Sequence, residues 1–125
     1  MPEASVQAAA TDGQFEARIE AVRKRFAAKF ADGMRQTIAD LPGMTGDGAV
    51  PADIVAKAYH WLHQISGIAA TIGLQSTGQS ARACDILLAG PYRAQRGLSA
   101  AELAQLTSHL DSLRRAARAE MHILE

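Results

Sequence analysis

The chain has 125 residues, which is enough for one domain with a single modest hydrophobic core. Its hydrophobic share of 48% excludes a disordered chain, and its 13 basic and 13 acidic residues cancel, so no general field attracts nucleic acid or an anionic membrane. No apolar run approaches the roughly 20 residues that a membrane-spanning helix needs. The single cysteine, Cys84, excludes an internal disulfide and fits a reducing compartment, so we expect a cytoplasmic location.

The first predicted helix follows a loose, alanine-rich leader at residues 1–10, and residues 11–125 are expected to form one helical bundle. Thr11 and Gln14 have the spacing of a capping box, so this helix should begin near Thr11 and stop before Pro42. Gly33 interrupts its apolar stripe and indicates a bend or a close helix contact. The stripe has steps of three or four: Phe15, Ile19, Val22, Phe26, Phe30, Met34, Ile38 and Leu41.

The second predicted helix starts near Pro51, because proline is tolerated in a first helical turn. Gly73 is expected to end it. Its predicted core face contains bulky aliphatic residues, one tryptophan and two alanines: Ile54, Ala58, Trp61, Leu62, Ile65, Ile68, Ala69 and Ile72.

Two more helices complete the pattern. The third is predicted between a capping box at Ser76 and Gln79 and the helix-breaking pair at 90–91, with Cys84, Leu87 and Leu88 facing inward. The fourth follows another capping box at Ser99 and Glu102, and its apolar stripe is Leu103, Leu106, Leu110, Leu113, Ala117, Met121 and Leu124. Four amphipathic helices joined by short loops predict an all-α, antiparallel up-down four-helix bundle, with an extra short N-terminal helix as an open alternative.

His63 lies on a face of the second helix that does not belong to the apolar stripe, because it is about 200° around the helix from both Trp61 and Ile65. This face has small residues where a solvated helix normally has Lys, Glu, Arg or Gln. It includes Gly67, although glycine inside a helix costs about 1 kcal/mol relative to alanine. One reason for a glycine there is clearance, which would let another surface reach the imidazole. The face comprises Ala56, Tyr59, His60, Ser66, Gly67 and Ala70.

On periodicity alone, the simpler interpretation is a surface histidine beside a few small residues. The spacing, however, resembles the signature of histidine-phosphotransfer (HPt) domains, in which the histidine is followed by an apolar residue at +2, glycine at +4, alanine at +6 and glycine at +10. Ile65, Gly67, Ala69 and Gly73 match these positions in register. The resemblance runs from about Phe15 to about residue 119, and it includes Arg82 and Asp85 on the third helix and the leucine-rich last helix.

The chain departs from the common HPt pattern at +3, where many members have lysine and this chain has Ser66. A hydroxyl can donate a hydrogen bond to a phosphate oxygen, but it supplies no positive charge. This difference puts the lifetime of a phosphohistidine, or the transfer rate, in question.

The resemblance implies a phosphorelay intermediate that is not an enzyme by itself. His63 would accept a phosphoryl group from a receiver-domain aspartate, or through a histidine kinase, and pass it on. Gly67 would give clearance and Ser66 would contact the phosphoryl group. The docking surface would consist of Ala56, Tyr59, His60, Ala70, Gln79 and Arg82, although Gln79 and Arg82 also fit ordinary capping or surface roles. Mg²⁺ would belong to the receiver partner, so no cofactor is expected for this chain, and we expect a monomer.

Two other functions stay open: an HPt-like module that docks a receiver or a kinase without transfer, and a structural bundle that matches the signature by chance.

His60 and His63 are close enough in sequence to share a metal. We expect no metal site, because the Glu-x-x-His pattern of helical-bundle metal sites is missing. Cys84 lies on an apolar stripe, so we expect a buried, inert thiol.

Overall fold

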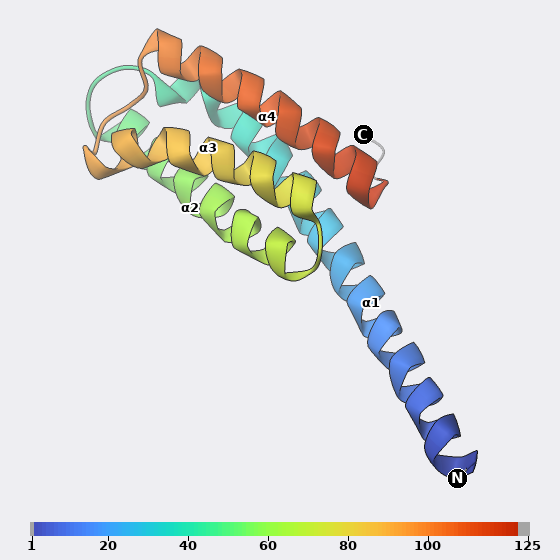
Figure 1. The fold of residues 1–125 in the computed structure, drawn as a ribbon. Coiled ribbons are helices and arrows are strands. Elements are labelled where there is room, and N and C mark those ends of the chain that lie inside the picture. Colours follow the sequence, from blue (N-terminus) through green and yellow to red (C-terminus); the bar gives the residue numbers. More distant parts are fainter. Residues whose placement is uncertain (1, 123–125) are drawn as a thin grey trace.

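The computed structural model describes the backbone of residues 2–122 and the side chains of residues 13–122. The helices are, in order, α1 (Pro2–Asp40), the short 3-10 helix η1 (Leu41–Met44), α2 (Ala49–Thr71), α3 (Gln75–Arg93) and α4 (Ala100–Met121). Consecutive α-helices run in opposite directions, and the described residues form no strand (Figure 1). The chain is therefore the all-α four-helix bundle that the sequence predicts.

The first helix is longer than predicted, because α1 begins at Pro2 and not near Thr11. The alanine-rich stretch before Gly13 contains no internal proline or glycine that would stop a helix, and alanine has the highest helix propensity. The side chains of residues 1–12, including Thr11 of the predicted capping box, lie outside the described part of the chain. Most residues of the expected leader thus continue α1, whose N-terminal half extends well beyond the other helices (Figure 1).

The predicted core stripe of the first helix is confirmed from Val22 to Met34 and again at Leu41, where Val22 and Leu41 are partly buried against the core. Phe26, Phe30 and Met34 are buried, whereas Phe15 is 63% exposed because it lies on the extended half of the helix. Near the other end of α1, Thr37 is buried and Ile38 is 39% exposed.

The core face of α2 is turned slightly from the predicted one. Trp61 is only partly buried and Ile68 is 38% exposed, while the predicted face omitted Val55, which is completely buried. Trp61 instead covers the crossing with α1, where its ring lies 5.9 Å from that of Phe30. The buried residues of α2 and the turn after it are Val55, Ala58, Leu62, Ile65, Ala69, Ile72 and Leu74. In the part of the chain that the structure describes, no helix is long and apolar enough to cross a membrane.

The most extensive helix pairing is between α2 and α3. Small side chains allow the two backbones to approach: a Cβ on Gly78 of α3 would lie 3.4 Å from the Ser66 carbonyl oxygen of α2. The three-residue connection 72–74 is equally tight. Gly73 has φ = +82°, a conformation that suits glycine, and it ends α2 as predicted.

The start of α3 is not the predicted capping box, since Ser76 and Gln79 do not cap each other. The cap comes from α4, where the Glu120 carboxylate accepts hydrogen bonds from the Ser76 N–H, the Thr77 N–H and the Thr77 hydroxyl, at 3.1, 2.6 and 2.7 Å. Burial alone would raise the pKa of Glu120, but these hydrogen bonds outweigh it and lower the pKa overall. The negative charge also suits the positive end of the helix dipole.

The pair at 90–91 does not end α3, because Pro91 lies inside the last turn of the helix. A proline so close to the C-terminus removes only one helical hydrogen bond, and Pro91 is buried against the rest of the bundle. The turn is closed by bonds from the Ala94 N–H to the Gly90 carbonyl and from the Arg96 N–H to the Pro91 carbonyl.

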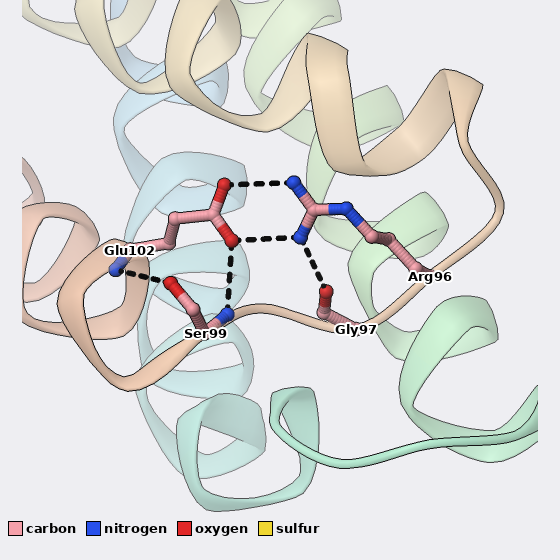
Figure 2. A network of polar contacts seen from close by, with 4 residues as sticks. All are labelled: Arg96, Gly97, Ser99 and Glu102. Atoms are coloured by element: carbon pink, nitrogen blue, oxygen red, sulfur yellow. Dashed lines mark hydrogen bonds and ion pairs between the residues drawn. The ribbon is translucent and has the colours of Figure 1, made fainter.

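The predicted capping box at the start of α4 is present, and it belongs to a larger network (Figure 2). The Glu102 backbone N–H donates to Ser99 Oγ, and the Ser99 N–H donates to Glu102 Oε1. Arg96 adds a bidentate contact to both Glu102 oxygens, at 2.7 and 3.0 Å, and a bond to the Gly97 carbonyl. The network fixes the connection between α3 and α4. Leu124, at the end of the predicted stripe of α4, lies outside the described residues.

Candidate functional site

His63 projects from α2 toward solvent while one of its ring nitrogens is held by α3. Its side chain is 67% exposed, and His63 Nδ1 lies 3.0 Å from Oδ2 of Asp85, a residue that is only 8% exposed. A carboxylate can only accept a hydrogen bond, so in the neutral ring Nδ1 carries the proton. Nε2 then has a free lone pair, and it has no hydrogen-bond partner among the described residues. The sequence motif contains His63, but it does not indicate the hydrogen bond between His63 and Asp85.

An aromatic cluster lies on the N-terminal side of His63. The Tyr59 ring is stacked between the rings of His63 and Tyr92, with centroids 5.8 and 4.3 Å away and interplanar angles of 20° and 13°. His60 meets the edges of both tyrosines, at 5.6 and 5.0 Å. Stacked and edge-to-face aromatic pairs in this range are attractive, so the cluster forms a firm wall beside the imidazole. Tyr92 was missed by the sequence analysis, because the helix was expected to end before it.

A shallow hollow of about 410 Å³ lies between α2 and α3, near the C-terminal side of His63. Gly67 is at its edge, and a Cβ added there would meet no atom within 4 Å, so the surface is open at this position. The hollow brings together residues that the sequence analysis proposed separately on two helices. It is lined by Ser66, Gly67, Ala70, Gln75, Gly78, Gln79 and Arg82.

Two polar side chains of this hollow differ in how free they are. The Ser66 hydroxyl donates a hydrogen bond to the His63 carbonyl at 2.8 Å, so its proton is used within the helix. Arg82 is exposed and forms no ion pair with another described residue. In this arrangement Arg82 can offer a positive charge to an anion in the hollow, whereas Ser66 offers only its oxygen lone pairs.

Ala56 is separated from the other predicted docking residues. It lines a second, larger hollow of about 930 Å³ at the opposite side of the aromatic cluster, together with Tyr92 and the loops around residues 46–49 and 95–99. The predicted docking surface therefore has two hollows, with the aromatic cluster between them.

The helices around His63 also carry the histidine pair that was considered as a metal site and the thiol of Cys84. Among the described residues, no group of three or more His, Cys, Asp or Glu side chains could hold a metal ion, and His60 packs on aromatic rings. Cys84, next to Asp85 on α3, is completely buried, and burial raises the pKa of its thiol to about 12. The thiol is thus buried and protonated, as the sequence analysis predicts.

Protein-family models, curated proteins and solved structures give no match to this chain. The function must therefore be inferred from the residues around His63. These residues provide an exposed imidazole with one hydrogen-bonded nitrogen, a cluster of aromatic rings beside it and an open hollow.

Proposed function

We propose that this chain is a phosphorelay intermediate that carries a phosphoryl group on His63 Nε2. The observation that supports it is the combination of a 67% exposed imidazole with an Nδ1 that is hydrogen-bonded to Asp85. Such a ring is fixed in orientation, and its nucleophilic nitrogen faces outward. The HPt-like spacing of Ile65, Gly67, Ala69 and Gly73 after His63 supports the same function.

The proposed donor is the aspartyl phosphate of a receiver domain. The Nε2 lone pair attacks phosphorus, an N–P bond forms, the P–O bond to the aspartate breaks, and the aspartate leaves as a carboxylate. The reverse reaction passes the phosphoryl group to a second receiver. Phosphoryl transfer requires mainly positioning and charge stabilisation, so a histidine on a rigid helix is sufficient on this side of the complex. Mg²⁺ would be bound by the receiver.

The surroundings of His63 fit an approach by a second protein. No side chain that the structure describes covers Gly67, and a Cβ there would meet none of the described atoms within 4 Å. The hollow beyond it offers Arg82 as a cation, which can interact with the phosphoryl group or with acidic residues of the partner.

The test is a transfer assay in which a receiver domain phosphorylated with acetyl phosphate is mixed with the chain. We expect acid-labile, alkali-stable label on the wild-type chain and on the His60→Gln variant, and none on His63→Gln. Both variants should keep the helical fold of the wild type, because both side chains are exposed, and circular dichroism checks this. No label from any of several receivers, on a folded chain, would contradict the proposal and favour a docking module without transfer.

A second variant separates docking from chemistry. Gly67→Leu should keep the fold, since the position is open, but it should slow transfer from a receiver by blocking its approach. Phosphorylation of the same variant by phosphoramidate, a small phosphoryl donor, should stay close to the wild-type rate. An equal loss with both donors would show that Gly67 matters for the histidine itself and not for clearance.

A further inference from the structure

We infer that Arg82 of α3 supplies the positive charge for the phosphoryl group on His63, in place of the lysine that many HPt domains have three residues after the histidine. This role rests on the proposed phosphoryl transfer, and it moves the charge from α2, where this chain has Ser66, to the neighbouring helix.

The antiparallel pairing of α2 and α3 places Arg82 opposite Ser66. His63 Nδ1 meets Asp85 Oδ2 at 3.0 Å across the two helices. Ser66 lies three residues after the histidine on α2, and Arg82 lies three residues before the aspartate on α3. Because the helices run in opposite directions, both steps lead the same way along the hairpin, by about 4.5 Å. Arg82 therefore stands across from the position at which the family has its lysine.

The same register continues one turn further. A Cβ on Gly78 would lie 3.4 Å from the Ala70 nitrogen, and each of these two residues is seven positions away from the hydrogen-bonded pair. Arg82 and Ser66, which lie between the two contacts, line the same hollow of about 410 Å³. Both the pairing of the helices and the hollow thus bring the Arg82 side chain to the side of His63 on which Ser66 lies.

Arg82 forms no ion pair with another described residue, although an acid lies one helical turn away. Elsewhere in the chain an arginine at this spacing pairs with the acid, as Arg35 does with Asp32. In α3 the acid is Asp85, which is only 8% exposed and is hydrogen-bonded to His63. The guanidinium of Arg82 is therefore available to an anion from outside the chain.

The composition of the hollow favours an anion beside His63. Among its described lining residues no side chain is acidic, and Arg82 is the one with a charge. The Ser66 hydroxyl donates to the His63 carbonyl at 2.8 Å, so its proton is already used. A phosphoryl group has three acceptor oxygens and a charge of about −1.5 to −2. A guanidinium matches such oxygens with several N–H donors and keeps its charge at every working pH.

The expected contribution of Arg82 is electrostatic. The Nε2 lone pair of His63 forms the N–P bond, and the bond from phosphorus to the leaving group breaks with its electrons on the leaving group. The guanidinium gives and takes no proton, and it balances the charge on the remaining phosphoryl oxygens. The rate should then require a cation beside the phosphoryl group, whichever of the two helices supplies it.

The test exchanges the charge between the helices. Arg82→Gln removes it, and Ser66→Lys added to the same chain returns a cation on α2. Arg93→Gln is the matched control, because Arg93 is also exposed on α3, forms no ion pair with another described residue and lies eleven residues or about 16 Å from Arg82. The rate is measured with phosphoramidate alone, in which the P–N bond breaks and ammonia leaves, so no partner protein contributes to it.

We expect Arg82→Gln to be phosphorylated at His63 about 10-fold more slowly than the wild type, and Arg93→Gln at the wild-type rate. Ser66→Lys combined with Arg82→Gln should return the rate to within about 3-fold of the wild type. The substituted side chains are exposed or at the edge of the hollow, so the helical fold should be kept, and circular dichroism checks this. Equal rates for Arg82→Gln and Arg93→Gln, or a folded double variant as slow as Arg82→Gln, would overturn the role.

The relay function and the role of Arg82 fail in different ways. If Arg82→Gln slows transfer from a receiver but not from phosphoramidate, Arg82 binds acidic residues of the partner; its role at the phosphoryl group is wrong and the relay function stands. If the phosphoramidate rates are as expected but no receiver transfers its phosphoryl group, the relay function is wrong and the role of Arg82 stands. A folded wild-type chain that phosphoramidate does not label at His63 would also overturn the role of Arg82.

Discussion

Gly33 of α1 lies directly against the indole ring of Trp61 of α2. A Cβ on Gly33 would be 2.2 Å from Trp61 Nε1, and two ring carbons would be within 2.6 Å. The glycine is the close helix contact that the sequence predicts at this position. It lets the largest side chain of α2 lie over α1 at the crossing of the two helices.

Gly33→Ala should therefore destabilise the bundle by about 1–3 kcal/mol, because the methyl group displaces Trp61. This loss opposes the gain of about 1 kcal/mol that alanine normally brings to a helix interior. Gly67→Ala is the matched control, since it is also inside a helix but meets no atom, and it should raise stability. Urea unfolding followed by Trp61 fluorescence checks both, and an equal effect of the two substitutions would contradict the contact.

Glu120→Ala should cost about 2 kcal/mol, because the Thr77 N–H and hydroxyl and the Ser76 N–H lose their acceptor. Thr77 is completely buried, so water cannot easily replace the carboxylate. The comparison is Glu20→Ala on the exposed side of α1, with an expected change within about 0.5 kcal/mol. Chemical unfolding of both variants gives the answer; a Glu120→Ala chain as stable as the Glu20→Ala chain would refute the interhelical cap.

The Arg96–Glu102 network should weaken in acid. The hydrogen bond from Arg96, followed by that from the Ser99 N–H, lowers the pKa of Glu102 from 4.5 to about 2. A carboxyl group with a lower pKa in the folded chain stabilises the fold above its unfolded pKa, and this contribution disappears as the pH falls through the folded value. The stability difference between the wild type and Glu102→Gln should be full near about pH 6, shrink below about pH 4 and be lost below about pH 2. If the stability difference between the two chains does not change over this pH range, the ionised Glu102 carboxylate does not stabilise the fold.

Cys84 should resist thiol reagents as long as the chain is folded. Burial raises the pKa of its thiol to about 12, so near about pH 8 almost none is the reactive thiolate. Modification should follow the global unfolding rate and become fast in urea. Cys84→Ala combined with Ser112→Cys, which places a thiol on the exposed side of α4, provides a freely reactive control. Rapid modification of the native wild type would mean that α3 opens locally around Cys84.

The helices could be predicted from the sequence because each has a strong local signal. The Ser99–Glu102 capping box and the Gly73 terminator depend only on neighbouring residues, and both are present as predicted. The start of α3 could not be found in this way, because its cap is Glu120, 43 residues away from Thr77. The end of α3 was predicted too early because proline usually stops a helix, whereas α3 continues past the buried Pro91 to Arg93.

The candidate site also combines features that the sequence predicts with features that depend on contacts between helices. The exposed side of α2 and the open position at Gly67 follow from helical periodicity, and the structure has both. The partner of His63 Nδ1 depends on how α2 and α3 are rotated against each other, and periodicity does not determine this. Asp85 was recognised only as an acidic residue at a family-like position. Tyr92 was not among the predicted site residues, because the third helix was expected to end at Pro91.

The short connection between α2 and α3 has a consequence for folding. His63 and Asp85 are 22 residues apart and belong to one tight helical hairpin, so they can meet without α1 or α4. Contacts of small sequence separation form early and require little loop closure. We therefore expect the geometry at His63 to be complete while the ends of α1 are still exchanging their amide protons with solvent.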